Sequence, residues 1–445
     1  MVRAHHFVLA VFMSLLLIGF VGGCGSAGTE HNLGNGAAGL SPTPSAVTNV
    51  AIPDTSNNRV LIYASPFTTN ENATIVLGQP GFTTASTGIT ASTLAVPAYT
   101  AYGRSGNLFA SDMGNCRVLE YKAPLSNGMS ASVVLGQTDF TSNSCGSPSA
   151  NTLDSPSGVA VDSHGNLWVS DSSHGRVLEY VPPFGQDSLF ANGMPATHAI
   201  GRPDLTSGGP CGHPASVTDS TLCEPLGIAF DPSGNLWVAD MNDNRVLEFK
   251  PPFSTGMSAS VVLGQPDLTT GAQCGLPGSA TGSTLCGPLA IASDQSGNLW
   301  LADSNNHRVL EFAPPFSNGM TASMVLGQPD FTSNSPNQGG SAGAGTMNAP
   351  QGVFFDSAGR LVVGDTGNNR TLVFDGPFSN GMNATAALGQ PDLSSASANQ
   401  GGSPSAATEN APLGAGPSLI GLLTLVVLIG IWAIWSRKRR SGSMT

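Results

Sequence analysis

Residues 156–180 read PSGVAVDSHGNLWVSDSSHGRVLEY, and this stretch decides the fold. Short apolar runs rich in Val and Trp flank the Gly165-Asn166 punctuation, a pattern typical of a β-hairpin. Residues 176–180 supply a third strand, and a fourth ends at Ala199-Ile200-Gly201. One unit of this chain is therefore predicted to hold four antiparallel strands.

The junction between the second and third strands recurs along the chain as Asp, four residues, Arg. The six pairs are Asp54 and Arg59, Asp112 and Arg117, Asp171 and Arg176, Asp240 and Arg245, Asp303 and Arg308, and Asp365 and Arg370. Successive arginines lie 58, 59, 69, 63 and 62 residues apart, which indicates one supersecondary unit copied in tandem. Tandem four-stranded units pack face to face around an axis, so the sequence predicts an all-β, six-bladed β-propeller over residues 47–395.

Two copies and the chain after the last one depart from the pattern. Copy one begins only at Asn49 and lacks a first strand, and copy two reads AYTAYG at 98–103 where the others read Gly-Val-Ala-Val-Asp. Residues 410–414, NAPLG, echo NAPQG at 348–352, within a Ser/Gly/Pro-rich linker at 396–417. We expect six blades, closed either by a partial strand from this linker or by an irregular N-terminal segment.

The recurring phrases resemble NHL repeats: Pro-x-Gly-Val/Ile-Ala-x-Asp, Gly-Asn-Leu-Trp-Val-x-Asp and Asn-x-Arg-Val-Leu-Glu-Phe. The resemblance spans roughly residues 47–395 and implies a propeller. NHL propellers bind proteins, nucleic acids or small ligands, and a few relatives are enzymes, so the resemblance alone does not choose a function.

Charge argues against nucleic acid as a partner. Of the 16 Lys and Arg residues, five lie at position 3 and at 437–440; the remaining 11 face all 28 acids, a net of −17. Such a surface repels phosphate backbones.

The N-terminal residues 1–24 resemble an export signal. Arg3 is followed by an apolar run from Phe7 to Val21, and VGGC at 21–24 resembles a bacterial lipobox, which makes Cys24 the expected lipidation site. Ordinary signal cleavage nearby is the alternative. A Gly/Ser/Pro-rich linker is expected at 25–46.

A membrane-spanning segment is expected near the other end. Residues 419–435 are apolar, with Trp432 and Trp435 at one edge and the basic run RKRR at 437–440 directly after it. We predict a transmembrane helix at 418–436 and a cytoplasmic tail at 437–445, which places the bulk of the chain outside the cell membrane. A sorting tail is the alternative reading.

Apart from Cys24, the cysteines number six, an even count in a chain expected to be exported. Two pairs share a spacing of 12 in successive links, and the remaining two fall on the same face of copy two. We predict three disulfides: Cys116–Cys145, Cys211–Cys223 and Cys274–Cys286.

Because strands alternate in direction, the Asp-to-Arg loops and the long links between blades share one face, which we name the linker face. The first-to-second turns and the third-to-fourth connections, which contain Asn-Gly or Thr-Gly before Met, share the opposite turn face, and we expect both to be tight. Length and variability concentrate on the linker face, so binding is expected there.

We found no catalytic constellation. The repeated Asp and Arg are expected to be structural, pairing and bracing their loops. Tryptophans 168, 237 and 300 are expected to pack between blades, and the histidines to be solvated in loops. Four acids end the innermost strands and could ring the channel to hold a divalent cation, although each also precedes a turn that needs such a residue: Asp162, Asp231, Asp294 and Asp356.

These observations favour a non-enzymatic, membrane-tethered module outside the cell that needs no cofactor and binds a protein, peptide or glycan. The alternatives are an enzyme of lactonase or lyase type that uses a channel metal, and a purely structural surface protein.

Overall fold

The computed structural model describes residues 20–21, 49–186, 189–209, 211, 217–271, 274 and 280–410. These described residues belong to one compact unit. The expected export signal 1–24 apart from residues 20–21, with its lipidation site Cys24, the linker 25–46, the transmembrane segment 418–436 and the tail 437–445 lie outside the described residues. Within the described part, no helix has the length and apolar character that a bilayer span requires.

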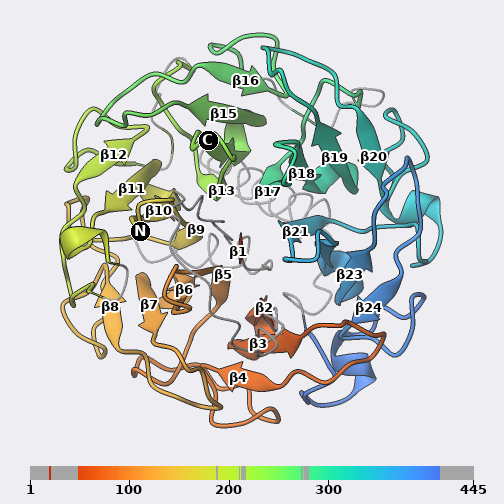
Figure 1. Cartoon of the computed structure of the whole chain (residues 1–445), viewed down its shortest axis with the longest axis horizontal. Helices are drawn as coiled ribbons and strands as arrows, with labels where there is room; N and C mark the ends of the chain where they lie inside the picture. The colour runs from red at the N-terminus through yellow and green to blue at the C-terminus, as the bar shows by residue number, and fades with distance from the viewer. Residues whose placement is uncertain are drawn as a thin grey trace, which may run out of the picture. The chain divides into compact units, whose positions relative to one another are not determined.

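Six sheets stand around a common axis, as predicted (Figure 1). Blade one is β2–β4, and blades two to six are β5–β8, β9–β12, β13–β16, β17–β20 and β21–β24. Among the described residues, blade one has three strands and no innermost strand of its own. A two-residue strand, β1 (Phe20–Val21), pairs in parallel with β5.

The strands of each blade begin or end at the same positions of the repeat. The innermost strands begin at Pro: β5 (Pro97–Tyr102), β9 (Pro156–Val161), β13 (Pro225–Phe230), β17 (Pro288–Ser293) and β21 (Pro350–Phe355). The second strands end at the repeated Asp: β2 (Asn49–Asp54), β6 (Leu108–Asp112), β10 (Leu167–Asp171), β14 (Leu236–Asp240), β18 (Leu299–Asp303) and β22 (Leu361–Asp365).

The third strands begin at the repeated Arg, directly opposite that Asp: β3 (Arg59–Ala64), β7 (Arg117–Tyr121), β11 (Arg176–Tyr180), β15 (Arg245–Phe249), β19 (Arg308–Phe312) and β23 (Arg370–Phe374). The outer strands are short: β4 (Ile75–Leu77), β8 (Val133–Leu135), β12 (His198–Ile200), β16 (Val261–Leu263), β20 (Met324–Leu326) and β24 (Ala386–Leu388).

A single 3₁₀ turn forms each Asp-to-Arg loop: η1 (Thr55–Asn57), η2 (Met113–Asn115), η3 (Ser172–His174), η5 (Met241–Asp243), η6 (Ser304–Asn306) and η8 (Thr366–Asn368). Three more lie in longer connections: η4 (Pro183–Gly185), η7 (Pro336–Gly339) and η9 (Ala398–Gly401).

The third-to-fourth connections are not the tight turns that we expected. They span ten or eleven residues in five blades and 17 in blade three. Each carries its Asn-Gly or equivalent pair to the outer strand of the preceding blade, and we call this pair the corner. In blade two, Asn127 Oδ1 accepts a bond from the Val76 N–H at 2.9 Å, and the Gly128 N–H donates to the Val76 carbonyl at 2.9 Å. The corners therefore join blades to one another.

The same corner contact closes the ring. Thr69 Oγ1 accepts from the Ala387 N–H at 3.2 Å, and the Asn70 N–H donates to the Ala387 carbonyl at 3.0 Å. The link after blade six also reaches blade one, where the Asn410 N–H donates to Asp54 at the end of β2 at 2.8 Å. The predicted tail thus contacts blade one, while its proposed closing strand, from residue 411 onward, lies outside the described residues.

The core lies between neighbouring sheets and along their inner strands. The three repeat tryptophans are fully buried, and each meets a Phe from the next blade's third-to-fourth connection edge to face, with ring centroids 4.8–4.9 Å apart. Such pairs add about 0.5–1.5 kcal/mol beyond area burial. The prediction that these tryptophans pack between blades is confirmed.

Candidate functional site

The six repeated Asp–Arg pairs are buried ion pairs. The distance from Arg Nε to Asp Oδ2 is 2.6–2.7 Å in every blade, and both side chains are fully buried. The second carboxylate oxygen of each Asp accepts a bond from a backbone N–H near the end of the incoming link; in blade five the Cys286 N–H donates to Asp303 at 2.6 Å. Burial raises the pKa of Asp303, while Arg308 acts in the opposite direction.

Each repeated Arg also holds the links on both of its sides. In blade five, Arg308 donates to the carbonyls of Thr281 and Thr284 in the incoming link, at 2.9 and 3.0 Å, and to Phe331 in the outgoing link. The guanidinium fork suits this task because its N–H groups point in fixed directions. These arginines are therefore committed to the structure of the linker face, as predicted, and do not present free charge to a ligand.

The third residue after the repeated Asp varies in an informative way. Asn occupies this position in four blades and donates to the Asp carboxylate, as Asn306 does to Asp303 at 2.9 Å. His174 replaces it in blade three, where its two ring nitrogens lie 2.9 Å from Asp171 and 3.1 Å from the Gly146 carbonyl. His174 is buried, so the expectation of a solvated loop histidine is wrong here.

His307 also departs from that expectation. It precedes Arg308 in the left-handed conformation, with φ of 55°, and its Nδ1 accepts a bond from the Ala349 N–H at 2.9 Å. Asn takes the same place in blades one and four, where Asn58 and Asn244 accept bonds from the corresponding link N–H groups at 2.9 and 2.8 Å. Burial lowers the pKa of His307 to about 4, which keeps the ring a neutral acceptor.

The four acids considered for a channel cation are turn caps. Asp162 accepts the N–H groups of His164 and Asn166 at 2.8 and 2.9 Å, and its second oxygen accepts Asn166 Nδ2 and Trp168 Nε1. Asp231 and Asp294 repeat this set of bonds, and Asp356 is paired with Arg360 at 2.7 Å. Their lone pairs already serve the turn, so these residues do not fit a cation site.

The metal-ligand geometry elsewhere is also unsuitable. Among the described residues, the single cluster of potential ligands is Cys116, Cys145 and Asp154, and its two sulfurs are joined to each other in a disulfide. A disulfide lacks the thiolate that binds metals.

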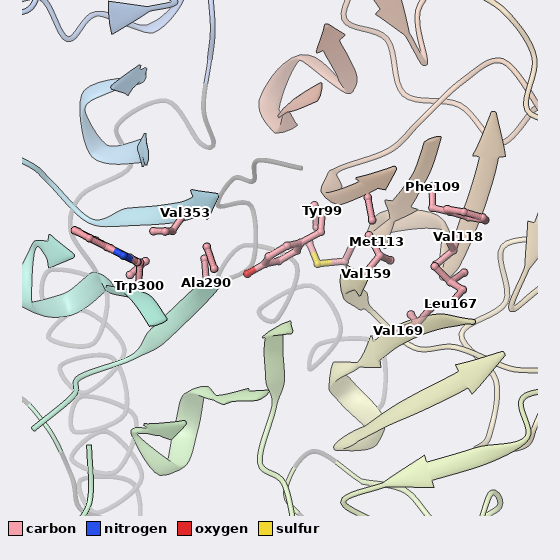
Figure 2. Packing of buried hydrophobic residues seen from close by; sticks show 14 of the residues in the cluster. Tyr99, Phe109, Met113, Val118, Val159, Leu167, Val169, Ala290, Trp300 and Val353 are labelled. Atoms are coloured by element: carbon pink, nitrogen blue, oxygen red, sulfur yellow. The ribbon is translucent and has the colours of Figure 1, made fainter. Parts of the chain in front are cut away.

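Tyr99 occupies the axis. Its place in the innermost strand is taken by Gly or Ala in the other blades, because the neighbouring strand comes close: a Cβ added at Gly158 would lie 2.2 Å from the Leu226 carbonyl oxygen. Tyr99 extends instead from blade two towards blade five, as Figure 2 shows beside Ala290, and its hydroxyl donates to the Leu289 carbonyl. This buried phenol fills space on the axis that a channel ligand would need.

The linker face carries the three disulfides. Cys116 is joined to Cys145, Cys211 to Cys223 and Cys274 to Cys286, so all three predicted pairs are present. Disulfides of this kind indicate an oxidising, extracytoplasmic location.

A pocket of about 380 Å³ lies on the linker face beside the Cys274–Cys286 bridge. Its wall includes Gln265, Thr270 and Asn306 from blades four and five and the link between them, and none of its lining residues is charged. The pocket offers hydrogen bonds and apolar contact to a ligand.

The linker face is acidic, and its cations are buried. Five exposed carboxylates follow the outer strands of blades two to six: Asp139, Asp204, Asp267, Asp330 and Asp392. Hydroxyl and backbone donors of the next residues lower the pKa of each, to about 2 for Asp139 and Asp330, so they are ionised. In the described chain, the exposed cations Arg104, Lys122 and Lys250 all follow strand ends on the turn face.

A family model for the NHL repeat matches residues 153–180, 222–249 and 285–312, which are the first three strands of blades three, four and five. This is an NHL-repeat β-propeller. The sequence resemblance is thus confirmed. Copies two and six share the same strand order, and copies one, two and six all share the buried Asp–Arg pair.

Among curated proteins, this NHL propeller is 28% identical over 295 residues to teneurin-1 of Mus musculus and 26% identical over 310 residues to human teneurin-4. These alignments cover 60% and 63% of the chain, which spans about a tenth of the length of those relatives. A solved streptogramin B lyase is 12% identical with a TM-score of 0.37, covering 73% of this chain and 78% of that one. Similarity at that level carries no argument about activity.

Proposed function

We propose that this NHL propeller is a non-catalytic binding module, displayed outside the cell membrane, that takes a protein, peptide or glycan ligand on its linker face. The proposal rests on the difference between the buried and the exposed charged residues of that face. Its repeated Asp and Arg residues are consumed in holding the links, whereas its five ionised carboxylates, its stapled links and its neutral pocket remain exposed to a ligand.

The charge of the linker face indicates which ligands are expected to bind there. A face with exposed carboxylates and no exposed cation in the described chain favours a ligand that presents Lys or Arg side chains or another cationic group. Charged rims mainly set the rate and selectivity of association and are screened within about 8 Å at physiological salt. The proposed contact therefore weakens as ionic strength rises.

The lactonase or lyase alternative is not favoured. It needs ligand atoms directed into an open channel, whereas the inner acids cap their own turns and Tyr99 fills the axis. Metal analysis of the purified full chain tests this reading independently, because a stoichiometric, chelator-sensitive ion would favour the enzyme.

The test of the binding proposal compares matched charge variants of the full chain in nanodiscs. The first variant changes the five linker-face acids to Asn, which keeps the acceptor oxygen of each turn and removes the charge. The control changes the turn-face cations Arg104, Lys122 and Lys250 to Gln. Partners are recovered from an envelope extract at low and physiological salt and quantified by mass spectrometry.

We expect a partner that is retained by the wild type and the turn-face control and depleted at least tenfold by the linker-face variant. A second variant, from which the segment of the link between Cys211 and Cys223 is deleted, tests whether the links themselves contribute to binding. Equal recovery of all partners by every variant contradicts the assignment of binding to this face.

A further inference from the structure

One link ends differently from the other five. In each link, the residue before the N–H that caps the repeated Asp lies over the Gly that follows the outer strand, and it is fully or almost fully buried. Five links place an apolar side chain there: Leu94, Leu153, Leu222, Leu285 and Met347. The sixth link, which closes the ring between blade six and blade one, places Glu409 there at 1% exposure.

Glu409 bridges the two blades that the closure joins. Its Oε1 accepts a bond from the Tyr63 hydroxyl of blade one at 3.2 Å, and its Oε2 accepts one from Thr371 of blade six at 2.9 Å. Both partners are hydroxyls, which can donate to a carboxylate or accept from a carboxylic acid. The site therefore holds the acid in either protonation state, and the surroundings decide between the two.

The surroundings disfavour the charged form. Burial, together with the negative charge of Asp54, raises the pKa of Glu409 from 4.5 to about 8. The hydrogen bonds from Thr371 and Tyr63 and the charge of Arg59 act in the opposite direction and are outweighed. Arg59 is already engaged by Asp54 at 2.6 Å and by the carbonyls of Ser405 and Thr408. Near neutral pH, Glu409 is accordingly a neutral carboxylic acid at the contact between blade six and blade one.

We propose that Glu409 is a proton-operated latch of the propeller ring, which holds blade six to blade one when it is protonated and releases the closing link, residues 398–410, when it is ionised. An ionised carboxylate in this site lacks the water that would solvate it, so it is stabilised when the link lifts from the Gly389 backbone. The other five joints, with Leu or Met in this place, have no such response.

The direction of the pH response follows from the pKa of Glu409, which is about 8 in the closed link and 4.5 when the group is solvated. Between about 4.5 and about 8 the closed link binds the proton that the open link has lost, so closure weakens as pH rises. In that window the opening equilibrium increases by up to about tenfold per pH unit. Below it the latch is fully closed, and above it the response levels off.

Hydrogen exchange of the full chain, corrected for intrinsic rates and measured from pH 5.5 to 8.5, tests the latch. The matched internal control is the link at 336–348, which has Met347 in the place that corresponds to Glu409. We expect protection of residues 398–410 to fall by one to two orders of magnitude over this range, while protection of residues 336–348 stays constant.

Two reciprocal variants make the test specific. Glu409→Met installs the residue of the neighbouring link and is expected to remove the pH response, and Met347→Glu is expected to create one in residues 336–348. Equal pH dependence of the two wild-type links, or an unchanged response in Glu409→Met, overturns the proposal. A response that persists in Glu409→Gln also overturns it, because Gln keeps the hydrogen bonds and cannot ionise.

Discussion

Replacing Arg308 by Met keeps an unbranched side chain as far as the Nε position and removes the guanidinium that organises the blade-five links. The substitution leaves the Asp303 carboxylate buried without its cation and removes the donors to the carbonyls of Thr281, Thr284 and Phe331. Breaking a buried pair on one side costs about 3–5 kcal/mol. For a propeller of this length, with an unfolding entropy of about 2 cal/mol/K per residue, that corresponds to a fall in Tm of about 5 °C.

The assay is calorimetry of the full chain, with hydrogen exchange to locate the damage. We expect the loss of protection to concentrate in the links on both sides of blade five. The double variant Asp303→Asn with Arg308→Met removes the stranded charge and should recover part of the loss, since Asn can still accept the Cys286 N–H. Lys250→Met, at an exposed site, is the control. A Tm for Arg308→Met within 1 °C of that control would refute the structural role of the repeated Arg.

Three further predictions concern other parts of the propeller. Replacing Cys274 and Cys286 by Ser is expected to destabilise their link locally by about 3 kcal/mol, because the bridge closes a short loop, and limited proteolysis of the link measures the change. The pKa of His307 is lowered to about 4, so its contribution to stability is complete above the usual value of 6.5 and is lost as pH falls from 6.5 towards 4, by at most about 3 kcal/mol. His307→Asn keeps an acceptor for the Ala349 N–H. Unfolding of this variant by denaturant should therefore depend less on acid pH than unfolding of the wild type. Tyr99→Ala should cost about 3–5 kcal/mol by leaving a cavity on the axis, and an unchanged Tm would show that the phenol is not packed there.

The repeat made most of the fold predictable. A strand that ends in Asp and a strand that begins with Arg, copied six times, specify the hairpin, the blade and the number of blades. The buried role of this pair was also predictable, because a residue present in every copy serves what every copy shares. Two disulfides followed from the equal spacing of cysteines in successive links, and Cys116–Cys145 followed from the shared face of the two remaining cysteines.

The features that the sequence did not predict depend on contacts between segments that are distant in the chain. The corners read as local Asn-Gly turns because sequence spacing does not show that they bond to another blade. His174 read as a loop residue because its burial depends on the link that covers it, not on its own neighbours in sequence. Tyr99 appeared only as a departure from the Gly consensus, whereas Glu409 is visible once the six links are aligned on their last residues.

The corner contacts restrict the ways in which this propeller can be recognised. An open sheet edge is a template for an incoming strand, and many peptide-binding domains capture ligands by adding one. Here the corner of the following blade binds the middle residue of each outer strand. The N–H of that residue donates to a corner side chain, and its carbonyl accepts from a corner backbone N–H, in blade six as in blade one. Strand augmentation is thereby blocked around the whole circumference, which also guards crowded copies against edge-to-edge polymerisation, and a ligand has to be read by side chains and loops.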